Sequence, residues 1–225
     1  KSVLSYALLG ISDRAARVTS GSAVFGGMDL LQADEHTLAD LRGREVSMVF
    51  QSPRTALNPI RPVGLQIQDV LRRHAAAPGV DLSRSLKERA VQALREVAIA
   101  DPEGRVQAYP FEMSGGMCQR VMIALALACR PRLLIADEPT TALDVTVQAQ
   151  VLALMRRLQA EMGAAVLFIT HDLGVVAQMA DEVAVMYAGR IVERAEVHAL
   201  FRAPRHPYTA GLLRARGIHR ILLVT

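Results

Sequence analysis

The order of apolar and polar positions in the first half of the chain predicts mostly helices. Four segments favour this structure: residues 3–10, 35–42, 64–74 and 83–99. Pro78 and Gly79 separate the last two segments. By contrast, Glu45–Gln51 is a short apolar run that predicts a buried strand, and Ser52–Pro62 is expected to be a loop.

The second half of the chain alternates predicted helices with predicted strands. The helices are Ser114–Arg130, Thr146–Met162 and Leu173–Met179, and the strands are Leu133–Asp137 and Ala165–Thr170. A hairpin over Glu182–Glu193, turning at Ala188 and Gly189, comes last. Strands that alternate with helices favour a parallel sheet covered on both faces, so the chain is predicted to be an α/β protein.

The composition fits one compact domain of this class. The chain has 225 residues, of which 51% are hydrophobic and 21% are charged. Its longest wholly apolar run, Val121–Cys129, is far shorter than the ~18 residues that indicate a membrane span. No signal peptide is indicated. Residue 1 is Lys rather than Met, so we expect an internal start within a longer chain.

The cysteines favour a reducing, cytosolic compartment, and the charge bears on possible partners. The 26 basic and 22 acidic side chains leave a net charge of +4. The excess lies in the C-terminal tail, where a solvated surface is expected rather than a nucleic-acid partner. Cys118 and Cys129, if they share one helix, lie about 16 Å apart. This separation exceeds the disulfide reach of about 7 Å, so both are expected to be free thiols.

Lys1 and Ser2 match the last two residues of the phosphate-binding pattern G-x-x-x-x-G-K-[ST] and precede an apolar segment, as they do in that pattern. There the lysine reaches the β and γ phosphate oxygens and the hydroxyl binds Mg²⁺. Taken alone, the pair carries no signal, and an arbitrary chain start is the favoured interpretation.

Asp137 and Glu138 stand at the end of the predicted strand Leu133–Asp137, and Pro139 stops that strand. This position allows Asp137 to hold Mg²⁺ through water and Glu138 to orient an attacking water as a general base. Acidic residues that merely cap a strand are an alternative at this point.

Ser114, Gly115 and Gly116 open a predicted helix. Ser114 suits the N-cap. The two glycines would let an anion approach bare backbone N–H groups at the positive end of the helix dipole. When the three residues are considered alone, a simple helix cap is the favoured interpretation.

The order of these elements resembles the layout of the ABC ATPases. The series runs from Lys1-Ser2 through Gln51, the helix opened by Ser114, the pair Asp137-Glu138, the turn Thr141-Ala142-Leu143-Asp144, and finally His171. Each element has an ordinary explanation by itself, but the six together in this order are not expected by chance.

The resemblance implies roles for the site residues and the cofactors ATP and Mg²⁺. Glu138 and His171 are implied to be catalytic. The implied Mg²⁺ contacts are Ser2, Gln51 and Asp137. The residues implied to contact nucleotide, some of them in the ATP site of a partner subunit, are Lys1, Ser2, Gln51, Ser114, Gly115, Gly116 and Asp144.

Longer motifs resemble the oligopeptide, dipeptide and nickel branch of this family. They are Phe50-Gln51 with Ala56–Pro59, Ser114–Met117, Ala136–Asp144, Ile169–Val176 and Pro204–Thr209, of which the last is the most branch-specific. Two departures stand out. Cys118 occupies a position where the branch usually has arginine, and the tail after Leu213 lacks the cysteine cluster of some members, so no iron–sulfur centre is expected.

The implied fold is a P-loop NTPase (RecA-like) core with a parallel sheet and an inserted α-helical subdomain. Residues 1–225 would form a single, partial ABC ATPase domain. Its parts would be a helical subdomain at 52–132, a continuation of the catalytic core at 133–193 and a C-terminal tail at 194–225. The resemblance also implies truncation at the phosphate-binding loop (Walker A), with the N-terminal strands missing. We therefore expect residues 1–225 alone to bind ATP weakly and hydrolyse it negligibly.

The implied function is ATP hydrolysis that energises ABC-type import of peptides at the cytoplasmic face of the cell membrane, with the chain bound peripherally. The implied partners are a second ATP-binding subunit, two membrane permease subunits and an extracytoplasmic substrate-binding protein. The cargo (oligopeptide, dipeptide or nickel) and the identity of the second ATPase, an identical or a sister chain, stay open. A non-catalytic chain that keeps only its interfaces is a further alternative.

A related class, the ABC-type ATPases of DNA repair and chromosome structure, places a long coiled coil between the glutamine strand and the signature helix. Residues 52–113 are too few for such an insertion. We therefore exclude this class.

Overall fold

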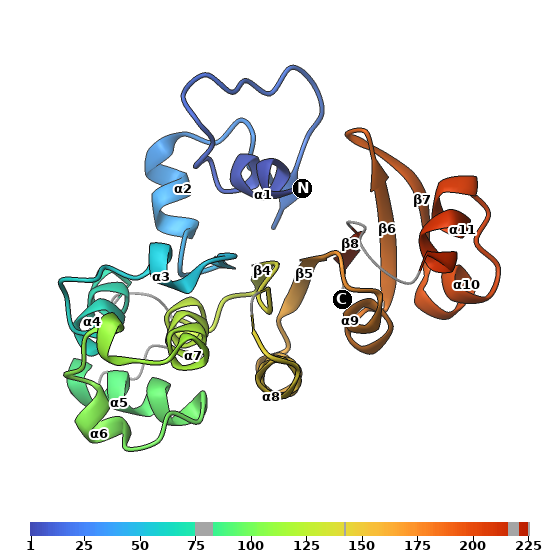
Figure 1. Ribbon diagram of the computed structural model, residues 1–225. Helices are drawn as coiled ribbons and strands as arrows, with labels where there is room; N and C mark the ends of the chain where they lie inside the picture. Colours follow the sequence, from blue (N-terminus) through green and yellow to red (C-terminus); the bar gives the residue numbers. More distant parts are fainter. Residues whose placement is uncertain (75–82, 142, 216–220, 225) are drawn as a thin grey trace. The chain divides into compact units, whose positions relative to one another are not determined.

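A computed structural model describes residues 1–74, 83–141, 143–215 and 221–224, the last four as backbone (Figure 1). The predicted break at Pro78 and Gly79, Ala142 of the predicted turn and part of the tail lie outside the described residues. The chain divides into two compact units, which are Gly43–Phe168 and the combination of Lys1–Arg42 with Ile169–Val224.

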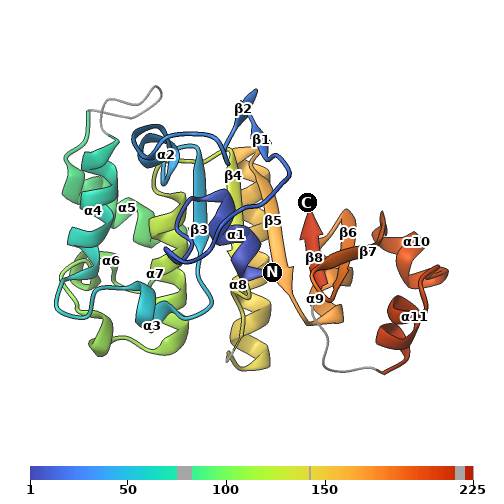
Figure 2. The ribbon, with the colours of Figure 1, turned by 90° about the horizontal axis from the view of Figure 1, so that it is seen from above.

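The strands of the Gly43–Phe168 unit confirm the predicted parallel arrangement. β3 (Val46–Val49) and β4 (Leu133–Asp137) pair in parallel, with Val46 opposite Leu133 and Val49 opposite Ala136 (Figure 2). β5 (Ala165–Thr170) lies next to β4 in the sheet. β3 is buried along its whole length, as expected when helices cover both faces of a sheet.

The prediction of a strand over Glu45–Gln51 was wrong at its end, because β3 stops at Val49 and Gln51 lies two residues beyond it. The expected loop Ser52–Pro62 also contains a short helix, α3 (Pro53–Ala56), whose first residue is a proline. Proline is favoured there because its fixed φ suits a helix and its missing N–H is not needed in the first turn.

The remaining helices of this unit are α4 (Val63–Arg73), α5 (Leu86–Glu96), α6 (Pro102–Arg105), η1 (Pro110–Glu112), α7 (Gly115–Leu127) and α8 (Val145–Met162). Four of them, α4, α5, α7 and α8, were predicted, whereas the short helices α6 and η1 were not. α5 is shorter than predicted because a capping box of Ser85 and Glu88 starts it and Ala98, with a left-handed φ of 56°, follows its end. α4, α5 and α7 pack against one another, and α7 also contacts β3 (Figure 1).

Gly64 allows α4 to approach the backbone that follows α6. The N–H of Gly64 donates to the carbonyl of Val106 at 2.9 Å, and the N–H of Val63 donates to that of Ala108 at 2.9 Å. A Cβ atom on Gly64 would lie 2.3 Å from the Val106 carbonyl oxygen. Only glycine therefore fits at this point of the packing.

The second unit contains two hairpins and several short helices. Its N-terminal part comprises α1 (Ser2–Leu8), the strands β1 (Val24–Phe25) and β2 (Met28–Asp29), and α2 (Glu35–Leu41). Arg42 connects the two helices, because its Nε donates to the carbonyl of Leu9 at 2.6 Å and its guanidinium pairs with Glu35 at 2.6 Å.

The C-terminal part of this unit is α9 (Leu173–Met179), β6 (Glu182–Tyr187), β7 (Arg190–Glu196), α10 (Val197–Arg202), α11 (Pro207–Arg214) and β8 (Ile221–Val224) (Figure 2). β6 pairs antiparallel with both β7 and β8. The hairpin turns where predicted but continues to Glu196. β8 was not predicted, because four apolar residues near a chain end carry little pattern of their own.

The carboxylate of Glu193 holds the segment Pro204–Thr209 on β7. Its Oε1 accepts from the N–H of Arg205 at 2.8 Å and its Oε2 from the N–H of His206 at 3.0 Å. His206 then caps α11 through Nδ1, which accepts from the N–H of Tyr208 at 3.1 Å. Tyr208 packs on Tyr187 of β6 with ring centroids 4.4 Å apart. The branch-specific motif is thus anchored by a buried carboxylate.

We predict that Gly64→Ala lowers the free energy of unfolding by about 1–3 kcal/mol, because the added methyl group forces α4 away from Val106. Gly211→Ala in α11 is the matched control, since a Cβ there meets no heavy atom within 4 Å. We expect the control to be neutral or stabilising by up to ~1 kcal/mol. Urea denaturation of the two variants tests this, and equal midpoints would contradict it.

We predict that Glu193→Gln lowers the free energy of unfolding by about 1–3 kcal/mol at neutral pH. Burial alone would raise the pKa of Glu193, but the N–H group of Arg205, the hydroxyl of Thr209 and the N–H group of His206 together hold the pKa below its ordinary value. A lowered folded-state pKa stabilises the fold above the unfolded pKa, and this stabilisation is lost as pH falls through the folded pKa.

The difference between wild type and Glu193→Gln should therefore shrink as the solution is acidified from neutral pH to below about pH 4. Denaturant titrations at several pH values measure it. A difference that does not change with pH would show that the charge of Glu193 does not stabilise this segment.

Candidate functional site

The carboxyl end of β4 carries a buried carboxylate. Asp137 is the last residue of this strand and is only 2% exposed. Its Oδ1 is buried and has no hydrogen-bond partner among the described residues. A buried carboxylate oxygen without a partner is costly unless a cation or water satisfies it. Carboxylate oxygen is a preferred ligand of Mg²⁺, so Asp137 fits the ion that the sequence predicts.

Glu138 follows Asp137 in a left-handed conformation, with φ at 47°. This conformation is uncommon for residues other than glycine and is often found at functional sites. It turns the side chain of Glu138 toward two polar groups. Its Oε2 accepts from Gln51 Nε2 at 3.3 Å and from Thr141 Oγ1 at 2.8 Å.

The structure therefore brings Gln51 together with two residues of a motif that lies far from it in the sequence. Gln51 and Glu138 are 87 positions apart, yet they form a direct hydrogen bond. Sequence reasoning named Thr141 only as part of a turn and missed its bond to Glu138. A sequence signal for this bond does exist, because Thr141 is a hydroxyl residue three positions after Glu138, the acidic residue that directly follows the strand.

The N-termini of α7 and α8 form a second part of the candidate site. Ser114 is the N-cap of α7 and its Oγ accepts from the N–H of Met117 at 3.3 Å. Asp144 is the N-cap of α8 and its Oδ1 accepts from the N–H of Val147 at 2.9 Å.

The two glycines of α7 have different surroundings. A Cβ on Gly116 would lie 2.9 Å from Cγ1 of Val147, so glycine is required there for α7 to approach α8. A Cβ on Gly115 would meet nothing within 4 Å. The backbone at Gly115 is thus accessible to a ligand, as the sequence predicts for an anion site.

Three predicted site residues lie in the other unit. Lys1 is the N-cap of α1 and Ser2 is its first residue. Lys1 Nζ donates to the carbonyl of Thr170, the last residue of β5, at 3.3 Å. His171 follows Thr170 directly, and Asp172 then caps α9 by accepting from the N–H of Gly174 at 2.8 Å. The described contacts thus bring the predicted phosphate lysine to the turn that carries the predicted catalytic histidine.

Both cysteines are free thiols, as predicted. They do not share a helix, because α7 ends at Leu127 and Cys129 lies beyond it. Cys118 is completely buried, and its Sγ donates to the carbonyl of Pro110 at 3.3 Å. Burial raises the pKa of Cys118. This cysteine therefore packs inside the unit under the segment that precedes Ser114.

Comparison with known families identifies the family to which the chain belongs. The family model described as "ABC transporter" matches residues 1–141. The chain belongs to the ABC transporter family, which confirms the resemblance derived from the motifs.

The curated relatives carry names from peptide transport. The chain is 49% identical over 215 residues to the dipeptide transport ATP-binding protein DppD of Escherichia coli (strain K12), covering 96% of this chain and 64% of DppD. It is 54% identical over 193 residues to the oligopeptide transport ATP-binding protein OppD of Bacillus subtilis (strain 168), covering 86% of this chain and 53% of OppD. The chain thus spans about two thirds or less of the length of these relatives.

Solved structures show the same fold. The ATP-binding cassette MJ0796, in a dimeric post-hydrolysis state with ADP and Pi, aligns with a TM-score of 0.70 at 24% identity over 86% of this chain and 80% of that chain. A second dimeric structure of MJ0796 aligns with a TM-score of 0.68 at 26% identity over 80% of this chain and 74% of that chain. The predicted α/β P-loop NTPase fold is confirmed. No helix among the described residues is long and apolar enough to cross a membrane.

Proposed function

We propose that this chain is the ATP-binding and ATP-hydrolysing part of an ABC importer for peptides. The observation that carries the proposal is the group formed by Gln51, Glu138 and Thr141 beside the buried carboxylate of Asp137. The names of the relatives DppD and OppD support peptides rather than nickel as cargo.

In the proposed mechanism, Lys1 would neutralise the β and γ phosphates of ATP, and the residues that would hold Mg²⁺ are Ser2, Gln51 and Asp137. When bound, Mg²⁺ offsets the negative charge that develops on the phosphate oxygens. Glu138 orients the attacking water and takes its proton, while Gln51 and Thr141 fix the carboxylate through hydrogen bonds. His171 is proposed to contact the γ-phosphate.

We propose that Ser114, Gly115, Gly116 and Asp144 serve the ATP site of a second ATP-binding subunit. The accessible backbone at Gly115 and the caps of α7 and α8 support this role. The dimeric state of MJ0796 supports a pairing of two such chains. Two membrane permease subunits and an extracytoplasmic substrate-binding protein would complete the importer, with this chain bound peripherally at the cytoplasmic face.

A non-catalytic role that retains only the interfaces is the second candidate. The left-handed backbone at Glu138 favours catalysis over it, because a conformation that costs of order 1–3 kcal/mol is retained where function requires it. One measurement distinguishes the two candidate functions. A chain with a glycine-rich phosphate-binding loop ahead of Lys1 turns over ATP if the catalytic function is correct and does not if the chain is non-catalytic.

In such a chain, we predict that Glu138→Gln slows hydrolysis by about 10²–10⁴-fold, the usual contribution of a general base. The amide can keep the hydrogen bond with Thr141 but cannot take a proton from water. ATP binding should persist, and an ATP-bound dimer should accumulate, because the paired subunits close but do not reopen.

Glu161→Gln in α8 is the matched control, since the one ion pair of Glu161 within the described part of the chain is an exposed pair with Arg157. It should hydrolyse ATP at the wild-type rate. Steady-state phosphate release and size-exclusion chromatography with ATP measure the two effects. Turnover in Glu138→Gln equal to that of the control would remove Glu138 from its proposed role.

We predict that Ser114→Arg abolishes turnover while the ATP affinity of an isolated chain changes less than about twofold. The bulky cation at the start of α7 would block the approach of a partner's nucleotide but leave the residues that bind ATP within its own chain. Titration with a fluorescent ATP analogue at concentrations where the chain is monomeric measures the affinity. Loss of ATP binding by the monomer would show that α7 serves its own nucleotide.

A further inference from the structure

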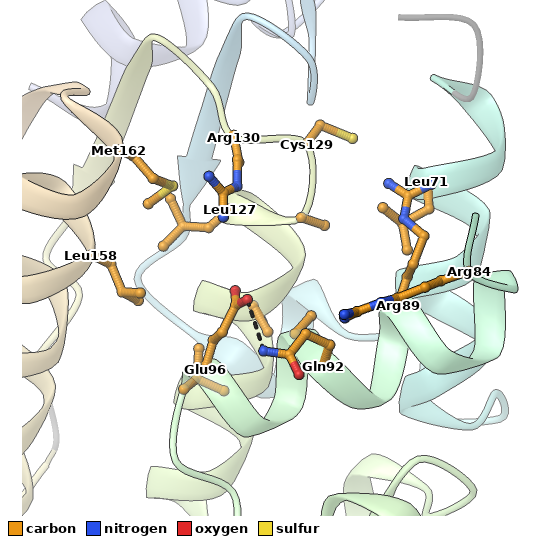
Figure 3. Close-up of a pocket in the computed structure, with 14 residues that line it drawn as sticks. Leu71, Arg84, Arg89, Gln92, Glu96, Leu127, Cys129, Arg130, Leu158 and Met162 are labelled. Carbon is orange, nitrogen blue, oxygen red and sulfur yellow. Dashed lines mark hydrogen bonds between the residues drawn. The ribbon is translucent and has the colours of Figure 1, made fainter. Parts of the chain in front are cut away.

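A cavity of about 380 Å³ lies among α4, α5, α7 and α8, within the unit Gly43–Phe168 (Figure 3). None of the predicted site residues lines it. Arg130 at its edge precedes the start of β4, whereas Asp137 ends that strand. The five residues of β4 separate the two positions by about 13 Å along the strand. The cavity is therefore distinct from the candidate ATP site.

The cavity has a basic rim. Arg84, Arg89 and Arg130 line it together with a single acidic side chain, Glu96. Figure 3 shows the three guanidinium groups around the cavity and the hydrogen bond that Gln92 donates to Glu96 at 3.2 Å. Among the described residues, neither Arg89 nor Arg130 forms an ion pair or a side-chain hydrogen bond. Two arginines at one cavity are thus available to an anion.

Arg89 faces the thiol of Cys129, which also lines the cavity. Burial raises the pKa of Cys129, and the positive charge of Arg89 opposes this change. Arg130 is held at the rim by a left-handed backbone with φ at 53°. A positive φ is uncommon for arginine, so the turn after α7 is a specifically shaped part of this rim.

The floor of the cavity is apolar. It is formed by side chains from all four helices: Leu71, Ala93, Ala124, Leu127, Leu158 and Met162. Leu71 and Leu158 are almost fully buried, so the floor belongs to the core of the unit.

We propose that this cavity binds a small molecule that carries a carboxylate on an apolar body. Its volume falls within the range of about 300–1,000 Å³ typical of small-ligand pockets. Guanidinium groups recognise carboxylates through paired hydrogen bonds. An inorganic anion would leave the apolar floor uncovered, and a neutral apolar molecule would bury the arginines without a partner.

Two kinds of ligand have this chemistry: a medium-chain fatty acid and a short apolar peptide with a free C-terminus. The peptide also carries an ammonium group. Glu96 lies seven residues after Arg89 on α5, about two turns or ~10 Å along the same helix face, and can accept from that ammonium. An N-acetylated peptide lacks this group and so distinguishes the two sources.

Protection of Cys129 from a thiol reagent tests the proposal without any use of ATP. The chain is labelled with N-ethylmaleimide in mildly alkaline buffer, and each cysteine is followed by mass spectrometry. Cys118 is completely buried and should stay unlabelled, so it reports an intact fold. Octanoate or the dipeptide Leu-Leu should slow labelling of Cys129, whereas octylamine, acetate and inorganic phosphate should not.

The double variant Arg89→Gln with Arg130→Gln should raise the half-protecting concentration at least about tenfold, because two charge-assisted contacts are lost. Arg156→Gln, an exposed arginine of α8 that does not line the cavity, is the matched control and should behave as wild type. Stronger protection by octanoate than by Leu-Leu identifies a fatty acid. The reverse, with loss on N-acetylation, identifies a peptide.

Three results would overturn the proposal. The first is labelling of Cys129 that none of the carboxylates slows. The second is equal protection of the double variant and wild type, which would mean that the arginines play no part. The third is protection by octylamine or by inorganic phosphate that equals protection by octanoate. Equal protection by octylamine would mean that the negative charge is not recognised, and equal protection by phosphate would mean that the apolar body is not recognised. Because no arm measures ATP turnover, these results are independent of the proposed transport function.

Discussion

The burial of Asp137 at the end of β4 is the constraint on which the arrangement of the candidate site depends. A carboxylate that is 2% exposed, with one oxygen lacking a hydrogen-bond partner among the described residues, is costly to the fold. The cost is acceptable if the oxygen meets a cation when the site is filled. The parallel pairing of β3 with β4 and the packing of α7 on β3 belong to the core in which this carboxylate is enclosed.

The backbone conformation directly after Asp137 shapes the candidate site at the end of β4. The left-handed conformation of Glu138 reverses the direction of the chain within one residue, so the carboxylates of Asp137 and Glu138 have different environments. Asp137 stays in the core, while Glu138 meets Gln51 and Thr141. The two adjacent acidic residues thus have different surroundings, which the proposed division into a metal ligand and a general base requires.

Helix α7 connects two ends of its unit. At its N-terminus, Ser114, Gly115 and Gly116 present backbone N–H groups, and near its C-terminus Ala124 and Leu127 line the basic cavity. Most of its residues between these points are buried, so the helix is a core element with little freedom to shift alone. The close contact of Gly116 with Val147 fixes its start against α8 in the same way.

The sequence by itself determined the longer elements and the family, since periodicity and short motifs act over a few residues. The α/β order, the strand Leu133–Asp137, the cap at Ser114 and the hairpin turn at Ala188 and Gly189 were all predictable from it. Only the tertiary structure decided which distant residues meet. The bond from Gln51 to Glu138, the burial of Cys118, the pairing of β8 with β6 and the cavity beside Cys129 all depend on packing between segments far apart in the chain, and no local pattern encodes such contacts.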